Sequence, residues 1–488
     1  MSDPTLVILD LFEQINAIPR CSSNEAALCR WLVSWADHRN LDHNCDKDGN
    51  LRVWLPASKG YESAPIIVLQ AHMDMVCEKT PDSSHNFDKD PIVSHREGEW
   101  LTATDTTLGA DNGIAIAYML ALAEDAGLDH PPIELLFTVD EETGLAGAKK
   151  LNPDFVKGRV LINLDSEDEG IFTIGCAGGI DTTITLHCEK ERVSSDPNCF
   201  HRLVVGGLKG GHSGIDIHKL RGNANRILAR TLDQIKNAVP IKLIALQGGT
   251  RTNAIPRDAE ALIWFEAIQG DDLVQTIAHI EQTLKKEYAV SDNALFVKLE
   301  KVSDIKSDEK ALTQKATDHI IQILLALPNG VSHMSPEMEG MVETSNNLAT
   351  VSLADGKLTI LSSQRSASIS RLDEITAAVT SVAKLAGATT QNHDAYPPWQ
   401  PMMDSLLLRR SKETYQQLYD RKPVIQVIHA GLECAVIGDL YPGMDMISFG
   451  PTIRNPHSPD ERIWIPSIKK VWDFLVSLLK RYCPDSPK

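Results

Sequence analysis

Three apolar segments of this 488-residue chain run directly into residues that can bind a metal ion or a proton. The segments cover 66–69, 133–139 and 160–164, and they lead to His72, to Asp140-Glu141-Glu142 and to Asp165. Helical patterns separate the three segments. Strands of this kind form a parallel or mixed sheet whose faces are covered and whose strand ends line one crevice. The sequence therefore predicts an α/β fold with a polar site at one edge of a buried sheet.

His72 and Asp74 stand two residues apart where the first apolar segment ends. Side chains on extended backbone alternate with period two, so both point to the same side. The Asp74 carboxylate can then accept the second ring N–H of His72 and fix the tautomer of a metal-binding histidine. The alternative is a core histidine beside a surface aspartate, and this pair alone does not decide between them.

Asp111 lies in the segment Gly109-Ala110-Asp111-Asn112-Gly113, which opens an apolar helical stretch over 114–122. Glycines on both sides of an acidic residue leave room for a metal ion and for the backbone of its ligand. An ordinary helix cap is the alternative interpretation of Asp111.

The start of the chain predicts two helices. Apolar residues have helical spacing over 6–18, and Ser22-Ser23-Asn24-Glu25 has the pattern of a capping box that begins a second helix. We expect both helices to be structural.

A second domain type begins near Ile180. Strand and helix patterns follow one another in the order of a ferredoxin-like split unit, over 200–205, 223–236, 241–246, 260–265, 272–288 and 294–299. A chain of this length exceeds one ordinary hydrophobic core, so two domains are expected. The segment Tyr396-Pro397-Pro398-Trp399 predicts a stiff connector where the chain returns to the first domain.

The formal net charge is −18, which argues against nucleic acid or an anionic membrane as the main partner. We find no run of about 18 apolar residues that could span a bilayer. Asp3, Asp10 and Glu13 interrupt the apolar residues of segment 1–20, whereas a signal peptide has an uninterrupted apolar region. The nine cysteines are scattered without a Cys-x-x-Cys pair. This pattern favours reduced thiols in the cytoplasm over a disulfide framework.

Five residues form a mixed nitrogen and oxygen donor set without a thiolate: His72, Asp111, Glu142, Asp165 and His457. Such a set suits zinc, manganese or cobalt in a catalytic site. A pair of ions needs a bridging carboxylate, for which Asp111 is the natural candidate. Glu141 and Glu142 cannot both point the same way on an extended loop, so one can bind metal while the other accepts a proton from water. The spacing does not say which, and acids that merely cap helices and face solvent are the alternative.

Several motifs together resemble the aminoacyl-histidine dipeptidase family, within the larger group of co-catalytic zinc exopeptidases. These motifs lie at residues 71–76, 109–113, 140–144, 164–167 and 457–461. Two further motifs narrow the resemblance to the dipeptidase branch, and they lie at residues 210–214 and 429–434. The resemblance extends over essentially the whole chain. It implies a zinc-exopeptidase-like mixed sheet covered by helices, formed by residues 1–180 and 396–488. Residues 181–395 would form an inserted α+β lid domain that contains ferredoxin-like units.

The resemblance also implies roles for individual residues. His72 and Asp165 would hold one zinc ion, Glu142 and His457 the other, Asp111 would bridge them, Asp74 would orient His72 and Glu141 would be the general base. The peptide between Asp111 and Asn112 would be cis. From the lid, His212, Asn253 and Arg365 would contact substrate, with His212 near the developing oxyanion and Arg365 on the free carboxylate, which its planar fork suits.

The expected function is hydrolysis of unblocked dipeptides by two zinc ions, for which cobalt or manganese could substitute, and a water activated by Glu141. Xaa-His dipeptides such as β-alanyl-histidine are expected substrates, and a cytoplasmic homodimer is the expected form. One alternative is an N-acyl amino acid hydrolase on the same scaffold, which would not require a free amino group. Another is a catalytically silent metal-binding protein, against which the intact acid set and Glu141 argue.

Overall fold

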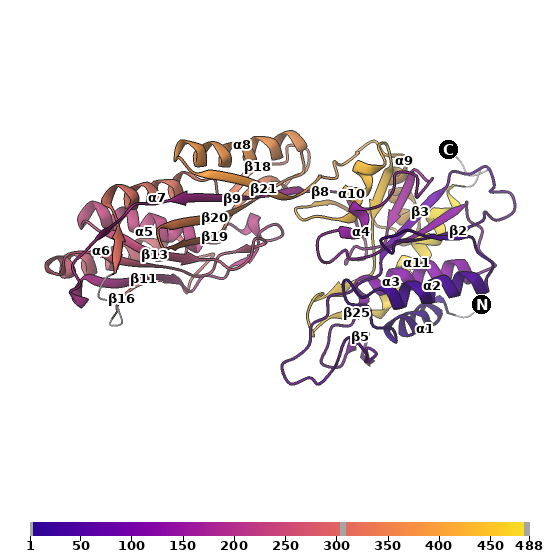
Figure 1. Cartoon of the computed structure of the whole chain (residues 1–488). Helices are drawn as coiled ribbons and strands as arrows, with labels where there is room; N and C mark the ends of the chain where they lie inside the picture. Colours follow the sequence, from indigo (N-terminus) through magenta and orange to yellow (C-terminus); the bar gives the residue numbers. More distant parts are fainter. Residues whose placement is uncertain (1–2, 303–308, 483–488) are drawn as a thin grey trace. The chain divides into compact units, whose positions relative to one another are not determined.

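The computed structural model describes residues 3–302 and 309–482 and divides the chain into two compact units (Figure 1). The first unit comprises Met1–Cys176, Trp399–Val427 and Leu432–Lys488, and the second comprises Ala177–Pro398 and Ile428–Gly431. The chain thus leaves the first unit after Cys176 and returns to it directly after the two prolines of the connector. The short segment Ile428–Gly431, which belongs to the second unit, was not anticipated from the sequence.

The first unit contains a large sheet, a small sheet and the helices around them. Its elements are α1 (Pro4–Asn16), α2 (Ala26–His38), β1 (His43–Cys45), β2 (Leu51–Leu55), β3 (Ile67–His72), β4 (Ser94–Glu97), β5 (Trp100–Ala103), α3 (Ala110–Glu124), β6 (Ile133–Thr138), α4 (Ala146–Lys149), β7 (Val160–Asn163), β8 (Ile171–Cys176), α9 (Leu406–Tyr419), β22 (Val424–Ile428), α10 (Glu433–Leu440), β23 (Asp445–Ser448), β24 (Ile453–Arg454), β25 (Arg462–Trp464) and α11 (Ile465–Lys480).

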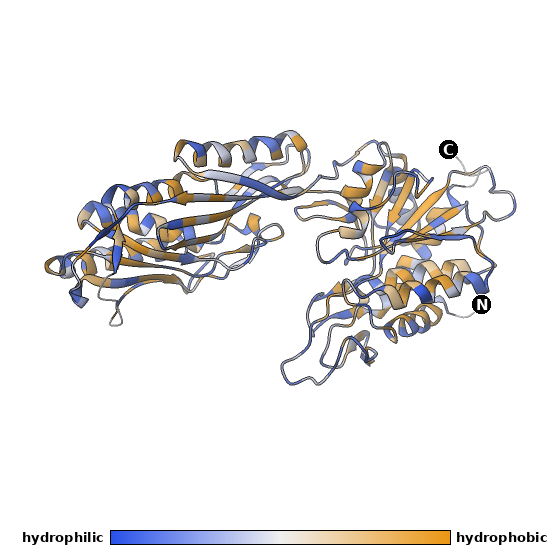
Figure 2. Ribbon diagram, viewed as in Figure 1, coloured by the Kyte–Doolittle hydropathy of each residue, from blue (hydrophilic) through white to orange (hydrophobic). Residues whose placement is uncertain are grey.

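The large sheet has the order β1-β2-β6-β3-β7-β23-β8-β22. Strand β3 pairs in parallel with both β6 and β7, and β23 pairs in parallel with β7. Strand β2 pairs antiparallel with β1 and β6, and β8 pairs antiparallel with β23. The predicted mixed sheet is therefore confirmed. Because β6, β3 and β7 are adjacent and parallel, the residues that follow them emerge at one edge of the sheet. The strands are mostly apolar in Figure 2, as expected for a sheet covered on both faces.

Helix α3 contacts β3 on one side and α1 on another, and every residue from Ala110 to Leu122 is buried. A helix that is apolar all round belongs in a core rather than at a surface. Its N-cap, Gly109, has φ 70°, a left-handed conformation that glycine adopts without steric cost. Asp111 has non-helical angles inside this first turn, and the Asp111–Asn112 peptide is cis, as the resemblance implied.

The second unit is built on a sheet of antiparallel strands. Its elements are β9 (Gly178–His187), β10 (Lys190–Arg192), β11 (Phe200–Gly206), β12 (Gly211–His212), α5 (Ala224–Ala238), β13 (Lys242–Gly248), β14 (Ala254–Ile255), β15 (Ala259–Trp264), α6 (Gly270–Glu287), β16 (Phe296–Lys301), β17 (Lys310–Leu312), α7 (Gln314–Ala326), β18 (Gly330–Met334), β19 (Val342–Ala354), β20 (Lys357–Ser366), α8 (Ile369–Leu385) and β21 (Thr389–Tyr396), with short 3₁₀ turns at Pro197–Cys199, Ile217–Lys219 and Ala267–Gln269.

Four strands of this sheet lie in the order β16-β11-β15-β13. With α5 and α6 between them in the chain, this is the spatial order 4-1-3-2 of a ferredoxin-like unit, so the predicted order of elements is present. Alternate residues of the strands form one core with the helices, for example Leu203 and Val205 of β11 with Leu228 and Leu232 of α5. Period-two burial of this kind shows that helices cover one face of the sheet (Figure 1).

The expectation that all thiols are reduced is wrong. Cys21 and Cys77 form a disulfide with their Cα atoms 5.7 Å apart, although 56 positions separate them in the chain. The pairing follows from the tertiary structure, because Cys21 lies beside Met75 in an isolated β-bridge. No spacing motif indicated it.

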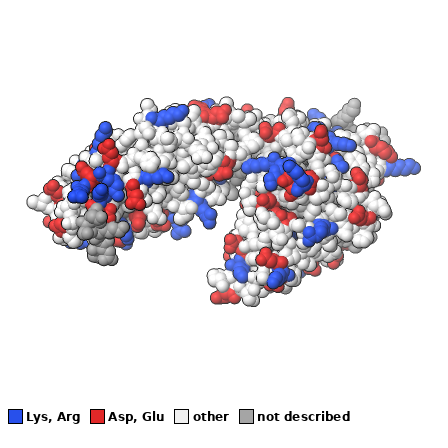
Figure 3. All heavy atoms as spheres, viewed as in Figure 1, with Lys and Arg blue, Asp and Glu red and all other residues white. Residues whose placement is uncertain are grey.

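No helix within residues 3–302 and 309–482 combines the length and the apolar composition that a membrane crossing requires. On the face that Figure 3 shows, acidic and basic side chains alternate over both units instead of forming one extended basic region among the described residues.

Candidate metal centre

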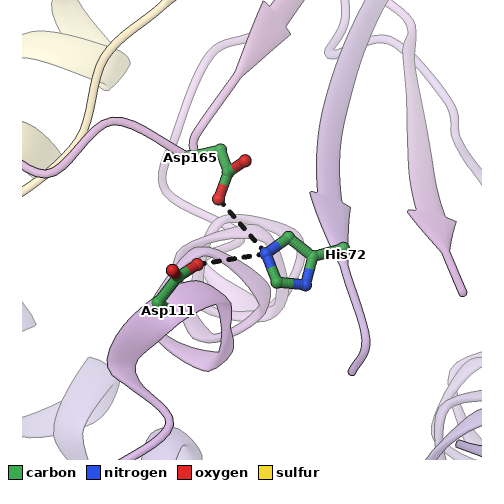
Figure 4. Close-up of side chains that lie close together, drawn as sticks. All are labelled: His72, Asp111 and Asp165. Carbon is green, nitrogen blue, oxygen red and sulfur yellow. Dashed lines mark hydrogen bonds and ion pairs between the residues drawn. The ribbon is translucent and has the colours of Figure 1, made fainter. Parts of the chain in front are cut away.

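His72, Asp111 and Asp165 converge at the edge of the large sheet (Figure 4). His72 is the last residue of β3 and is only 1% exposed, while Asp165 follows β7 and Asp111 opens α3. The Nε2 atom of His72 lies 3.0 Å from Asp111 Oδ1 and 3.3 Å from Asp165 Oδ1. One nitrogen and two carboxylate oxygens therefore face a common point.

A second group shares Asp111 with the first. His457, on the loop between β24 and β25, places its Nε2 atom 3.1 Å from Asp111 Oδ2 and 3.0 Å from Glu142 Oε1. The two oxygens of Asp111 thus face two different histidines. This is the arrangement that a carboxylate needs in order to bridge two ions.

The donor set fits two divalent metal ions. Each group offers one imidazole nitrogen and two carboxylate oxygens without a thiolate, as in catalytic zinc, cobalt or manganese sites. Among the described residues, Glu142 Oε1 is buried without a hydrogen bond of good geometry, and its polar neighbour is His457 Nε2 at 3.0 Å. A buried carboxylate oxygen without a hydrogen bond is costly unless a cation or proton satisfies it.

The acids and histidines of the site perturb one another strongly. Burial alone would lower the pKa of His72, yet the carboxylates of Asp165 and Asp111 raise it well above 6.5. Burial also opposes the charge of His457, but Asp111 and Glu142 raise its pKa to about 11. Burial raises the pKa of Asp165 to about 6. The carboxylates therefore create a potential that favours cations at this edge of the sheet.

Asp74 connects His72 to the loop that carries both glutamates. Its Oδ1 atom accepts a hydrogen bond from Glu141 N at 3.0 Å and lies 3.3 Å from His72 Nδ1. Its Oδ2 atom accepts from Glu142 N at 3.2 Å and from Ser22 Oγ at 2.8 Å. Burial opposes ionisation of Asp74, but His72 and these donors lower its pKa to about 2.

The two neighbouring glutamates differ in their surroundings. Glu142 faces His457, whereas Glu141 groups with His72 and Glu142. Burial raises the pKa of Glu141 well above its usual value, and the charges of Asp165, Glu142 and Glu433 add to this effect, opposed by His72. A buried carboxylate with a raised pKa beside a cluster of candidate metal ligands is a candidate general base.

His212, Asn253 and Arg365 all belong to the second unit. His212 pairs with Ala254 across β12 and β14, and Ser213 N donates to Asn253 O at 2.8 Å. The Nδ1 atom of His212 accepts hydrogen bonds from Gly214 N at 3.2 Å and Ile215 N at 3.0 Å. The ring proton is therefore held on Nε2.

Arg365 lies on β20 and donates from Nη1 to Tyr396 OH at 3.1 Å. Burial lowers the pKa of His212 to about 4, and the Arg365 charge contributes to this lowering. His212 is therefore a neutral imidazole at neutral pH, with Nε2–H available as a donor.

Several buried groups around the site were not among the predicted site residues, although the sequence placed Glu433 near the returning strands. Glu25 does not form the predicted capping box. Instead, its Oε1 atom accepts from Ser23 N and from Asp140 N, both at 3.0 Å, and so holds the metal-site loop. Glu433, which is fully buried, accepts from Gln70 Nε2 at 2.6 Å and Thr138 Oγ1 at 2.7 Å, behind the strand ends.

Arg20 and Glu461 were also missed. Both are almost completely buried and hydrogen-bond to the backbone of the metal-site loops. An acid inside the motif that contains His457 was a signal for Glu461. A single arginine after a helix gave no signal, since arginines are mostly exposed.

Comparisons with known proteins identify the family of the chain. The model of the peptidase family M20/M25/M40 matches residues 68–481. The cytosol non-specific dipeptidase of Escherichia coli (strain K12) is 43% identical over 471 residues, which are 96% of each chain. A crystal structure of aminoacylhistidine dipeptidase from Vibrio alginolyticus superposes with a TM-score of 0.88 at 40% identity and covers 98% of this chain and 97% of that one.

A more distant structure, the aminopeptidase PepT from Bacillus cereus ATCC 10987, shares the fold with a TM-score of 0.57 at 16% identity over 98% of both chains. The matches confirm the α/β fold class and the family resemblance inferred from the motifs. The chain therefore belongs to the peptidase family M20/M25/M40, a family of hydrolases that act on peptide bonds.

Proposed function

We propose that this protein is a dinuclear zinc dipeptidase that hydrolyses unblocked dipeptides. The observation that carries the proposal is the position of Asp111, whose two carboxylate oxygens face His72 and His457 separately. The similarity to the E. coli cytosol non-specific dipeptidase over 96% of both chains supports the dipeptide substrate class.

In this proposal His72 and Asp165 would hold one ion, Glu142 and His457 would hold the other, and Asp111 would be a ligand of both. Zinc is the first choice, with cobalt or manganese as substitutes, because the set combines imidazole and carboxylate. When bound, such ions polarise the scissile carbonyl and lower the pKa of water towards neutrality.

Glu141 acts as the general base. It accepts a proton from the attacking water and returns it to the leaving amine. The Asp74 carboxylate accepts from the backbone N–H groups of Glu141 and Glu142 and lies 3.3 Å from His72 Nδ1, which keeps the base and the first histidine in a fixed relation.

The second unit acts as a lid that recognises the dipeptide. His212 donates its Nε2–H to the developing oxyanion, because Nδ1 is occupied by two backbone amides. Arg365 binds the free carboxylate with its planar fork, and Asn253, next to His212, contacts the substrate. Recognition of both ends of the substrate would restrict its length to two residues.

We further propose Xaa-His dipeptides, including β-alanyl-histidine, as substrates. The aminoacylhistidine dipeptidase from Vibrio alginolyticus, 40% identical, supports this choice. A cytoplasmic location follows the name of the E. coli cytosol dipeptidase. A homodimer remains our expectation from the family resemblance.

The test compares hydrolysis of β-alanyl-histidine with hydrolysis of its N-acetylated form. Protein is stripped of metal with a chelator and assayed before and after zinc is restored. We expect zinc-dependent cleavage of the free dipeptide alone. Cleavage of only the acetylated form would assign the protein to the N-acyl amino acid hydrolases instead.

A Glu141→Ala variant separates catalysis from metal binding. We expect it to bind zinc as the wild type does and to lose turnover by about 10² to 10⁴-fold, the usual contribution of a general base. Retained activity would remove Glu141 from this role, and inactivity of the zinc-loaded wild type on both peptides would favour the silent metal-binding alternative.

A further inference from the structure

Arg20 is a buried cation next to the metal centre. It lies in the segment between α1 and α2 and is 1% exposed. Its Nη1 atom donates to the backbone oxygens of Met73 at 3.2 Å and Asp74 at 3.1 Å, and its Nη2 atom donates to Gly109 O at 2.5 Å. One guanidinium thus joins the loop after β3 to the turn that opens α3.

Glu461 approaches the same turn through its backbone N–H groups. It is 2% exposed and lies on the loop of His457, four residues further along. Its Oε2 atom accepts from Leu108 N at 2.7 Å and Gly109 N at 2.8 Å, and its Oε1 atom accepts from Asp111 N at 3.2 Å. The loop of the second histidine is thereby tied to the proposed bridging ligand.

At the turn around Gly109, the Arg20 guanidinium therefore donates to the Gly109 carbonyl oxygen, and the Glu461 carboxylate accepts from the backbone N–H groups. A side chain at Gly109 would overlap the Arg20 guanidinium, and a Cβ atom at Gly113 would lie 2.6 Å from Arg20 Nη2. Close packing of this kind leaves the turn little freedom to move.

Arg20 and His72 both contact the backbone oxygen of Asp74. The backbone oxygen of Asp74 accepts from Arg20 and lies 3.1 Å from His72 Nδ1. Neither Arg20 nor Glu461 belongs to the groups of residues whose ligand atoms converge on a point. Arg20 and Glu461 therefore do not contact an ion at that point themselves, and their influence on its coordination geometry passes through His72, Asp111 and His457.

We propose that Arg20 and Glu461 are positioning residues that set the spacing of His72, Asp111 and His457 and thereby the affinity and coordination geometry of the metal centre. This inference rests on the proposed function, because it assumes that those three residues bind metal. If the two residues only stabilised the fold, their replacement would change unfolding but leave the metal affinity of the folded protein unchanged.

The variants Arg20→Lys and Glu461→Gln test the proposal with little change in size. A lysine has one ammonium group and cannot donate to three carbonyl oxygens in the planar arrangement of a guanidinium. A glutamine keeps one acceptor oxygen and turns its NH₂ group towards either Asp111 N or the amides of Leu108 and Gly109. Each variant thus loses hydrogen bonds to the turn without leaving a large cavity.

Matched controls exist elsewhere in the chain. Glu134 is fully buried and accepts from Lys157 N at 2.8 Å and Gly158 N at 2.9 Å, so Glu134→Gln repeats the loss of a buried carboxylate that binds amides. Arg226 donates to backbone oxygens in the second unit, so Arg226→Lys repeats the loss of an arginine that binds carbonyls.

Zinc affinity is measured by competition with a chelating dye, and coordination geometry is measured by the visible absorption of the cobalt-loaded protein. Circular dichroism and thermal unfolding of the metal-free proteins establish that each variant is folded. We expect Arg20→Lys and Glu461→Gln to bind zinc about 10 to 100-fold more weakly, the usual effect of residues that orient metal ligands, and to shift the cobalt spectrum. Activity should recover at excess zinc, and both controls should bind metal as the wild type does.

Two outcomes contradict the proposal in different ways. If the wild type binds zinc and the folded Arg20 and Glu461 variants match it in affinity and cobalt spectrum, the positioning role is wrong while the proposed function stands. If the wild type itself binds neither zinc nor cobalt, the proposed function fails, and the inference fails with it.

Discussion

Replacing Asp74 by asparagine is the most direct test of how the site is held together. The carboxylate is fully buried, and each of its oxygens faces two donors: Glu141 N and His72 Nδ1 at Oδ1, and Glu142 N and Ser22 Oγ at Oδ2. An asparagine must direct its NH₂ group towards one of these pairs. A serine hydroxyl can rotate to accept, but a backbone N–H cannot, so at least one backbone donor of the glutamate loop loses its partner.

The magnitude follows from two independent arguments. A hydrogen bond to a charged group contributes about 1.5 to 3 kcal/mol. The lowering of the Asp74 pKa from 3.8 to about 2 corresponds to about 2 kcal/mol at 1.36 kcal/mol per pKa unit. Because the pKa of the folded state is depressed, this stabilisation is complete above about pH 4 and is lost as the pH falls towards 2.

At neutral pH we therefore expect Asp74→Asn to lower kcat/KM by about 10 to 150-fold, or to weaken zinc binding by the same factor, since about 1.4 kcal/mol corresponds to a factor of ten. The assay is dipeptide hydrolysis at saturating zinc beside a dye competition for zinc. Asp445→Asn is the control, because Asp445 also accepts from a serine hydroxyl, Ser405 Oγ, and from a backbone amide, Leu407 N, but away from the site. If Asp74→Asn stays within twofold of the wild type in both measurements, the reasoning is wrong.

Three further predictions concern the lid and the disulfide. Arg365→Met should lower kcat/KM for a free dipeptide by an amount that corresponds to about 2 to 5 kcal/mol of lost transition-state stabilisation. The variant should have little effect on the dipeptide amide, which lacks the carboxylate. Equal losses on both substrates would exclude the proposed contact between Arg365 and the carboxylate. His212 has a pKa of about 4, so NMR titration of its ring nitrogens should show the neutral form, with the proton on Nε2, down to about that pH; a midpoint near 6.5 would contradict this. Cys77→Ser should lower the free energy of unfolding by about 2 to 4 kcal/mol in oxidised protein, and urea unfolding should show no difference in the presence of a reductant.

Local patterns in the chain were sufficient for the part of the site that the ends of the parallel strands form. Apolar runs that end in acid or histidine report buried strands and their polar ends, and adjacent parallel strands must expose those ends at one edge. Each of the three strands ends close to one of His72, Glu142 and Asp165 in the sequence. The positions of these residues therefore already indicate that they meet. The distant His457 was identified through its motif, since nothing in local periodicity links it to Asp165, Glu142 and His72, which lie 292, 315 and 385 positions earlier.

Contacts between loops were decided by the tertiary structure alone. The packing of separate loops decides which of Glu141 and Glu142 faces His457. It also brings Glu25 to Asp140 and Cys21 to Cys77. The period of a strand or helix does not encode such packing. Arg20 shows the limit most clearly. Its side chain is buried because Gly109 and Gly113 leave space for the guanidinium and because the carbonyl oxygens of two other loops accept hydrogen bonds from its Nη1 and Nη2 atoms. A charge can be buried only where such partners converge, and that convergence exists only once the chain has folded.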